Sequence, residues 1–224
     1  IKLITHEEKH FVTLTRYYYS EKSVGDKVKY LVEKSPPLSF DVNTIYDKLR
    51  KESVTDTVAL NEDQQRGIIS CLTNKVSIIT GGPGTGKTTL IKKLLSILEE
   101  QHATYKLAAP TGRAAKRIIE GTGKHALTLH RLLEFDVSNM QFARNEQHTL
   151  QLDFLIIDEA SMIDIFLANA ILRAVPFKAH VIFIGDVDQL PAVGAGNFLN
   201  DLIQSKIAAC VQLTEIFRQA QNSL

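Results

Sequence analysis

The chain has 224 residues, of which 44% are hydrophobic, and its 26 basic and 25 acidic side chains leave a net charge of +1. This length is enough for one large domain, or for one domain with a small appendage. The balanced charge argues against a generally basic nucleic-acid binder, so any basic surface must be local. Because no apolar run approaches the about 18 residues that cross a bilayer, and the N-terminus does not resemble a signal peptide, we expect no membrane partner.

The two cysteines, Cys71 and Cys210, are far apart in the sequence and lack the spacing of a metal site. We interpret them as reduced thiols in the cytoplasm. The sequence begins at Ile1 rather than Met, and residues 213–224 read as the start of an unfinished amphipathic element. We therefore expect the chain to be part of a longer protein.

Residues 1–58 are expected to form a small helical segment that precedes the main domain. Four apolar residues recur at helical spacing on one face: Val24, Val28, Leu31 and Val32. Pro36 and Pro37 cannot continue this helix, so it ends there. A shorter helix is predicted at residues 42–51, followed by a linker.

From residue 59 to residue 224, short apolar strands alternate with helices. The expected strands are Val76–Thr80, Tyr105–Ala109, Phe154–Asp158 and His180–Asp186. The expected helices are Thr88–Gln101, Gly112–Glu120, Asp164–Val175 and one that begins near Gly196. This alternation predicts an α/β fold, a parallel sheet with helices on both faces. Residues 134–152 interrupt it, and their pattern of FDV, a Ser-Asn turn and MQFAR predicts a projecting β-hairpin.

The segment GGPGTGKT, residues 81–88, follows a predicted strand and opens a predicted helix. In that context G-x-x-x-x-G-K-[ST] is a P-loop, whose backbone N–H groups surround phosphate oxygens. The predicted nucleotide-binding residues of this segment are Gly82, Pro83, Gly84, Thr85, Gly86, Lys87, Thr88 and Thr89. Lys87 would reach the β- and γ-phosphates of ATP, and Thr88 would bind Mg²⁺.

Polar residues follow two further strands. Asp158 at such a strand end usually completes the Mg²⁺ site of a P-loop enzyme. Glu159 beside it could act as the general base that polarises the attacking water, which favours hydrolysis over simple nucleotide binding. Gln189 would lie near the γ-phosphate, because the carboxyl ends of parallel strands share one edge. Asp186 and Asp188 fit a loop-capping role better than a catalytic one.

A basic segment, APTGRAAKR, follows the second strand and includes Thr111, Arg113, Lys116 and Arg117. A hydroxyl and three cations near a helix N-terminus suit the phosphodiester backbone, although a basic helix face is more often simply solvated. His130, taken alone, fits a structural histidine better than a catalytic one.

The ordered set of motifs resembles the first motor domain of RecD-like DNA helicases of superfamily one, the exodeoxyribonuclease V alpha-subunit family. The matching segments, between about residue 60 and residue 224, are LNEDQQ, GGPGTGKTT, APTGRAAKR, TLHRLL, LIIDEASM, FIGDVDQLPAVGAGNFLNDL and EIFRQA. The segment RYYYSEKSV, residues 16–24, is also similar to the helical part that precedes the motor in stand-alone members. The resemblance implies a RecA-like P-loop fold.

The resemblance also implies roles for individual residues. Gln64 would read adenine, although the neighbouring Gln65 leaves the register open. Arg218 would stabilise charge on the transferring phosphoryl group. Thr111 and His130 would line the path of single-stranded DNA, and Gln189 would couple the γ-phosphate to DNA. The hairpin at 134–152 would be the pin that separates strands.

The resemblance implies ATP-driven 5′→3′ movement on single-stranded DNA with Mg²⁺ as cofactor. Such helicases need a second RecA-like domain, which we expect to be absent here, so we expect the chain alone to hydrolyse ATP slowly and not to unwind DNA. Two alternatives remain open: a helicase-like module of a conjugative relaxase, and a nucleotide-gated, non-catalytic DNA-binding subunit. A partnership of the RecBCD type is also left open.

Overall fold

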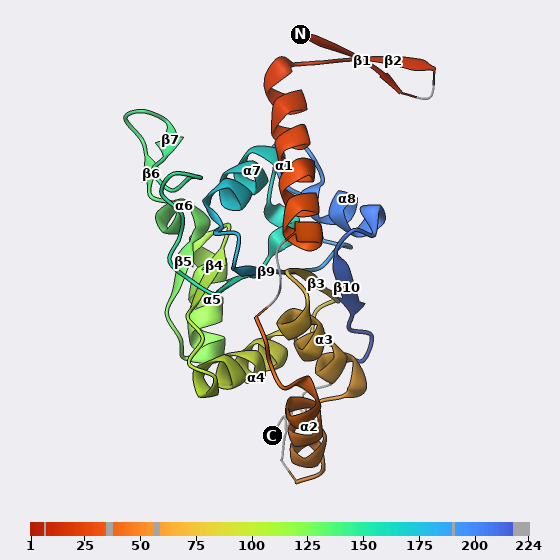
Figure 1. Cartoon of the computed structure of the whole chain (residues 1–224), viewed down its shortest axis with the longest axis vertical. Coiled ribbons are helices and arrows are strands. Elements are labelled where there is room, and N and C mark those ends of the chain that lie inside the picture. Colours follow the sequence, from red (N-terminus) through yellow and green to blue (C-terminus); the bar gives the residue numbers. More distant parts are fainter. Residues whose placement is uncertain (7, 35–37, 56–58, 190, 217–224) are drawn as a thin grey trace, which may run out of the picture.

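The computed structural model describes residues 1–6, 8–34, 38–55, 59–189 and 191–216 (Figure 1). Its centre is a six-stranded sheet in the order β10-β3-β9-β8-β4-β5, and every neighbouring pair in it is parallel. The strands are β3 (Val76–Thr80), β4 (Tyr105–Ala109), β5 (Ala126–Thr128), β8 (Phe154–Ile157), β9 (His180–Gly185) and β10 (Ala209–Gln212). The predicted strands form the middle of this sheet, and β5 and β10 at its edges were not predicted.

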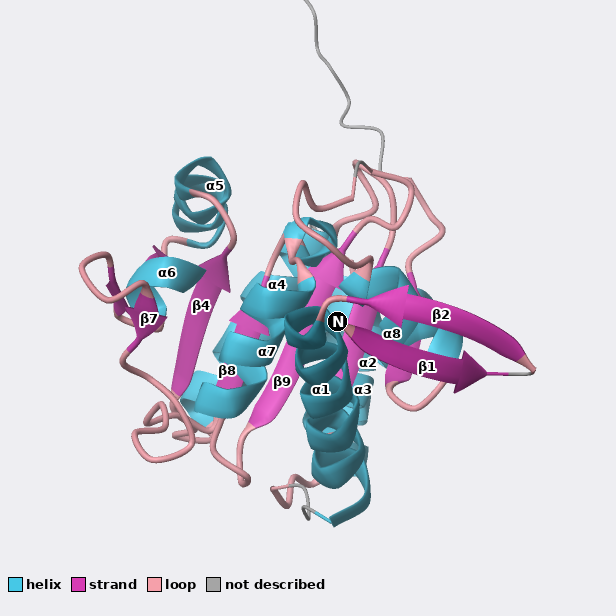
Figure 2. Ribbon diagram, turned by 90° about the horizontal axis from the view of Figure 1, so that it is seen from above, coloured by secondary structure: helices cyan, strands magenta, loops and turns pink. Residues whose placement is uncertain are grey.

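Helices cover both faces of the sheet, as the sequence predicted (Figure 2). The helices are α1 (Thr15–Lys34), α2 (Val42–Thr55), α3 (Glu62–Thr73), α4 (Lys87–Glu100), α5 (Gly112–Thr122), α6 (Leu129–Leu132), α7 (Ile165–Ala174) and α8 (Phe198–Ser205), with a 3₁₀ turn η1 at Ala160–Met162. The core on one face joins the sheet to α1, α7 and α8. The core on the other face joins it to α2, α3, α4 and α5. Among the described residues, no helix is long and apolar enough to span a bilayer.

The helical segment near the N-terminus packs directly on the sheet domain. Val24, Val28 and Leu31 of α1 are buried in the same core as α7. Leu49 of α2 is buried in the opposite core. Val32, at the margin of the same helix face, is 38% exposed.

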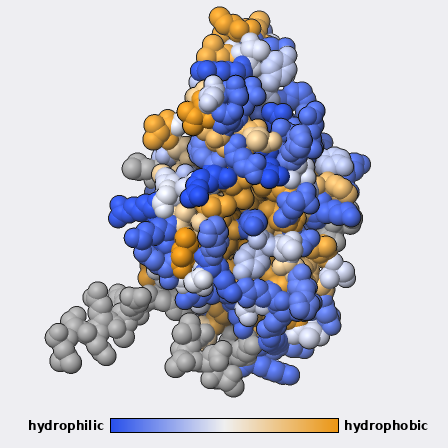
Figure 3. Space-filling model, turned by 90° about the vertical axis from the view of Figure 1, so that its left-hand side faces the viewer, coloured by the Kyte–Doolittle hydropathy of each residue, from blue (hydrophilic) through white to orange (hydrophobic). Residues whose placement is uncertain are grey.

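Two antiparallel hairpins extend from this body. The first, β1 (Lys2–His6) with β2 (Lys9–Thr13), was not predicted. It projects beyond the start of α1 in Figure 1, and its exposed apolar side chains form the hydrophobic tip at the top of Figure 3. The second, β6 (Phe135–Asp136) with β7 (Gln141–Phe142), is the predicted one and is short. Its turn is closed by Asp136, whose Oδ1 accepts from Ser138 N at 2.8 Å.

Candidate functional site

The strand order places the loops that follow β3, β9, β8 and β4 along one edge of the sheet. Thr80 pairs with Gly185, so the P-loop begins beside the end of β9, and Gly81 N donates to Gly185 O at 3.3 Å. Asp158 N donates to Ala108 O at 3.0 Å, which places the end of β8 beside the end of β4. The P-loop, Asp186–Gln189, Asp158–Glu159 and the start of α5 therefore meet at the same edge.

The P-loop has the backbone geometry that its glycines predict. Gly84 and Gly86 are in the left-handed region, at φ 79° and 81°, where a side chain would be strained. The ammonium of Lys87, the first residue of α4, donates to Gly81 O at 2.6 Å and to Gly82 O at 2.9 Å. Thr85 Oγ1 donates to Gly82 O at 2.8 Å. Lys87 is thus held over the loop, with its charge facing the backbone that would surround a phosphate.

Gln64 braces this loop. Its Oε1 accepts from Asn61 N at 3.1 Å, and its backbone N donates to Asn61 Oδ1 at 2.8 Å, which completes a capping box at the start of α3. Its Nε2 lies 3.3 Å from Thr85 O and 3.4 Å from Gly86 O, and the side chain is only 1% exposed. The adenine contact of Gln64 stays a prediction. The bracing role was missed, although the N-x-x-Q spacing is a capping signal.

Thr88 lies in the first turn of α4 and is packed against α5. A Cβ added to Gly121 would lie only 2.6 Å from Thr88 Cγ2, so the absence of a side chain at Gly121 lets the two helices approach. The close approach involves the methyl group of Thr88 and not its hydroxyl oxygen. Thr88 is thereby fixed at the N-terminus of α4, where the helix favours anions.

Asp158 and Glu159 follow β8 side by side. Burial raises the pKa of the Asp158 carboxyl, and Asp158 Oδ1 accepts from Glu159 N at 2.9 Å. Glu159 is in the left-handed region, at φ 55° and ψ 39°. Its Oε1 accepts from Arg117 Nη2 at 2.9 Å, a contact between α5 and the end of β8 that the sequence did not predict.

The residues present fit a Mg²⁺ ion. Thr88 and Asp158 supply hard oxygen donors, and a cation would offset the cost of burying the Asp158 charge. Within the described ranges, no cluster of three or more His, Cys, Asp or Glu could hold a metal ion.

Asp186 organises the loop after β9. It is buried, its Oδ1 accepts from Asp188 N at 3.0 Å, and its Oδ2 accepts from Gln189 Nε2 at 3.2 Å. This geometry fits the loop-capping role predicted for Asp186. It holds the Gln189 amide against the end of β9, the strand next to the P-loop strand β3.

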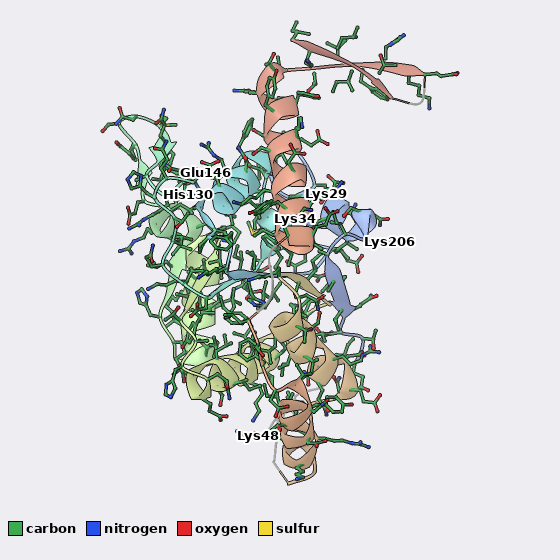
Figure 4. All side chains as sticks on the ribbon, viewed as in Figure 1. Lys29, Lys34, Lys48, His130, Glu146 and Lys206 are labelled. Atoms are coloured by element: carbon green, nitrogen blue, oxygen red, sulfur yellow. The ribbon has the colours of Figure 1, made fainter. Side chains whose placement is uncertain are left out.

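The predicted DNA-contacting residues lie on neighbouring elements. Thr111 is the N-cap of α5, where its hydroxyl accepts from Ala114 N at 3.2 Å, and Arg113 is exposed in the first turn. His130 on α6 (Figure 4) packs against both aromatic rings of the β6–β7 hairpin: edge-on against Phe135, with ring centroids 5.4 Å apart, and tilted against Phe142, with ring centroids 5.5 Å apart. The structure therefore shows a supporting contact for His130, and its contact with DNA stays a prediction.

Arg218 lies outside the described residues. The segment that precedes it is bound to the end of β3, where the P-loop begins: Leu213 N donates to Thr80 O at 2.7 Å. The Thr214 hydroxyl donates to Asp63 Oδ2 at 2.8 Å, and this hydrogen bond lowers the pKa of the Asp63 carboxyl. Residues 213–216 are thus attached to the first turn of α3.

Comparison with known proteins shows which family the chain belongs to. A family model described as an AAA domain matches residues 64–195. The chain belongs to this AAA domain family. Membership implies that the chain uses a nucleotide.

Curated relatives confirm the resemblance to RecD-like helicases. The chain is 40% identical to the ATP-dependent RecD2 DNA helicase of Deinococcus radiodurans over 161 residues. The match covers 72% of this chain and 22% of the relative. It is 35% identical to the RecBCD enzyme subunit RecD of Mycolicibacterium smegmatis, covering 85% of the chain and 37% of the relative. The RecBCD enzyme subunit RecD of Haemophilus influenzae is 33% identical, and the match covers 84% of this chain and 33% of that relative. The chain thus spans a minor part of each relative.

A solved structure agrees with the fold. The Pif1 helicase from Candida albicans superimposes on this chain with a TM-score of 0.53 at 27% identity. The match covers 73% of this chain and 41% of the Pif1 chain. The predicted RecA-like P-loop architecture is therefore confirmed.

Proposed function

We propose that the chain is the first ATP-binding motor unit of a RecD-type DNA helicase that couples ATP hydrolysis to 5′→3′ movement on single-stranded DNA. One observation carries the proposal: Lys87, the pair Asp158–Glu159 and Gln189 meet on one sheet edge, beside the exposed basic start of α5. A simple nucleotide-binding module would not need a second carboxylate beside Asp158. The similarity to proteins named as helicases supports the same proposal.

The roles follow from position. The P-loop residues 82–89 bind the phosphates, and Lys87 leaves its backbone acceptors for the β- and γ-phosphate oxygens, which are stronger partners. Thr88 and Asp158 bind Mg²⁺, which supplies charge neutralisation at the transferring phosphoryl group. Glu159 orients the attacking water, Gln189 senses the γ-phosphate and Gln64 contacts adenine.

We propose that residues 59–224 form the motor unit, with residues 1–58 as its helical N-terminal segment and residues 134–152 as its pin. Arg218 reaches the γ-phosphate, while Thr111, Arg113 and His130 contact DNA. We favour a cytoplasmic protein that works alone over a subunit of a RecBCD-type complex, because the relative named as a helicase is 40% identical and the two named as RecD subunits are 35% and 33% identical.

The test uses nucleotide binding and hydrolysis together. Lys87→Ala should abolish Mg²⁺-dependent binding of a fluorescent ATP analogue while single-stranded DNA binding persists. Glu159→Gln should keep nucleotide binding and lose hydrolysis. Nucleotide binding that is unchanged in Lys87→Ala would refute the assignment of the P-loop as the nucleotide site. Nucleotide and DNA binding by the unaltered chain without any hydrolysis would refute the motor and favour the nucleotide-gated, non-catalytic DNA-binding subunit.

A further inference from the structure

Glu159 and Arg117 form an ion pair between the end of β8 and the face of α5. The Arg117 side chain is 61% exposed, whereas the Glu159 side chain is only 16% exposed. Glu159 is also restrained by its backbone, which is in the left-handed region and donates to Asp158 Oδ1 at 2.9 Å. The carboxylate is therefore held on the protein side, and the cation that holds it faces solvent.

The neighbouring basic residue on α5 is arranged differently. Lys116 pairs within its own helix, with its Nζ 3.6 Å from Glu120 Oε1, and both side chains are well exposed. Arg113, one turn earlier, is exposed as well. The side of the molecule that carries α5 is predominantly hydrophilic (Figure 3). Of Arg113, Lys116 and Arg117, only Arg117 has a described ion pair with a carboxylate of the candidate active site.

A planar guanidinium is the side chain best matched to both carboxylate and phosphate oxygens. A phosphate that approached Arg117 would meet the Glu159 carboxylate at the same guanidinium, and two anions at one cation repel each other. Binding of a phosphodiester and retention of the 2.9 Å contact with Glu159 therefore oppose each other.

We propose that Arg117 is a contact for single-stranded DNA phosphate, and that DNA and Glu159 compete for it. When DNA occupies Arg117, the Glu159 carboxylate is released and can orient water. Arg117 then acts as a positioning residue that links DNA occupancy to hydrolysis. This inference rests on the proposed function, in which Glu159 is the general base and single-stranded DNA is the track.

Competition makes a prediction that needs no ATP, because coupling between two binding events is reciprocal. Removing the Glu159 charge should free Arg117 and raise DNA affinity by about two- to fivefold, the range expected for breaking a partly exposed ion pair. The gain should vanish when Arg117 is absent. Arg117→Ala alone should weaken binding and reduce the slope of log affinity against log salt concentration by about 0.7, the value for one phosphate contact on a single strand.

The experiment is a fluorescence anisotropy titration of a fluorescein-labelled oligothymidylate, without nucleotide. The proteins are the unaltered chain, Glu159→Gln, Arg117→Ala and the double variant. Two variants serve as controls. Lys116→Ala removes a neighbouring cation and should leave the gain from Glu159→Gln intact. Asp158→Asn removes the adjacent carboxylate without breaking the ion pair and should give no comparable gain.

The outcomes separate this inference from the proposed function. If Glu159→Gln raises affinity equally with and without Arg117, the effect is a general one of charge and the competition is refuted. If the unaltered chain does not bind the oligonucleotide, the DNA part of the proposed function fails and this inference fails with it. In an ATPase assay, Arg117→Ala should raise hydrolysis without DNA and shrink the stimulation by DNA, and an unchanged stimulation would also overturn the inference.

Discussion

Acid should destabilise this protein through one buried histidine. His180 begins β9 on the edge opposite the P-loop and is fully buried, with its ring stacked on Phe154 at 4.5 Å. Its Nε2 accepts from Leu38 N at 3.1 Å, and its Nδ1 is 2.9 Å from Asn74 O. The neutral ring with its proton on Nδ1 satisfies both contacts. A second proton on Nε2 would remove the acceptor for Leu38.

Burial, together with the charge of Lys75, lowers the pKa of His180 to about 4, and the hydrogen bond with the Asn74 backbone opposes this only in part. An unfolded chain has its histidines near the ordinary value of about 6.5. Between these values the unfolded state binds more protons than the folded state, so the free energy of unfolding falls as the pH is lowered through this window. At about pH 5 the loss is about 2 kcal/mol, and well below pH 4 it approaches about 3 kcal/mol.

The assay is thermal or urea unfolding at about pH 7 and about pH 5, on the unaltered chain and on His180→Phe. The phenyl ring keeps the stack on Phe154 but leaves Leu38 N and Asn74 O unpaired, which should cost about 1–3 kcal/mol at neutral pH. Between the two pH values, the free energy of unfolding should fall by about 2 kcal/mol less in the variant than in the unaltered chain. This difference is equivalent to about 4–8 °C in melting temperature. Equal losses in the two proteins would refute the reasoning, because all other titrating groups are common to both.

Three further changes test the packing around the site and the core. Gly121→Val should displace Thr88 through the 2.6 Å contact and weaken Mg²⁺-dependent nucleotide binding; unchanged binding in a calorimetric titration would contradict the packing role. Gln64→Ala should remove the capping box and the brace on the P-loop, with a loss of about 1–2 kcal/mol that chemical denaturation would measure. Leu31→Ala should cost about 2–5 kcal/mol, whereas the neighbouring Val32→Ala, at an exposed position, should cost about 0.5 kcal/mol or less, and similar losses in both would show that α1 is not part of the core.

Local sequence patterns predicted the middle of the molecule well. The strands β3, β8 and β9 are buried along their whole length, so their sequences are mostly apolar without alternation, as a covered parallel sheet favours. The P-loop was predictable because its glycines are needed for positive φ, which is a property of single residues. The edge strands β5 and β10 were missed because short, partly exposed strands have no such run.

Contacts between distant segments were not predictable. Arg117 and Glu159 are 42 residues apart in sequence, and either one alone reads as a solvated charge or a strand-end carboxylate. Their proximity follows only from β4 and β8 being neighbours in the sheet. The hairpin β1–β2 was missed for a different reason: its apolar side chains are exposed on both faces, so the alternation that identifies a half-buried strand is lost.

The position of β3 in the sheet has a consequence for synthesis of the chain. The strand that carries the P-loop is made early, yet its two neighbours are made late: Val76 pairs with Val181, and Ser77 pairs with Ala209. While the chain emerges from the ribosome, β3 therefore remains without lateral hydrogen-bonding partners until β9 is complete, and its second edge stays open until β10 follows. A ribosome that stalls before β9 would leave both edges of this strand open to pairing with other chains and therefore to aggregation.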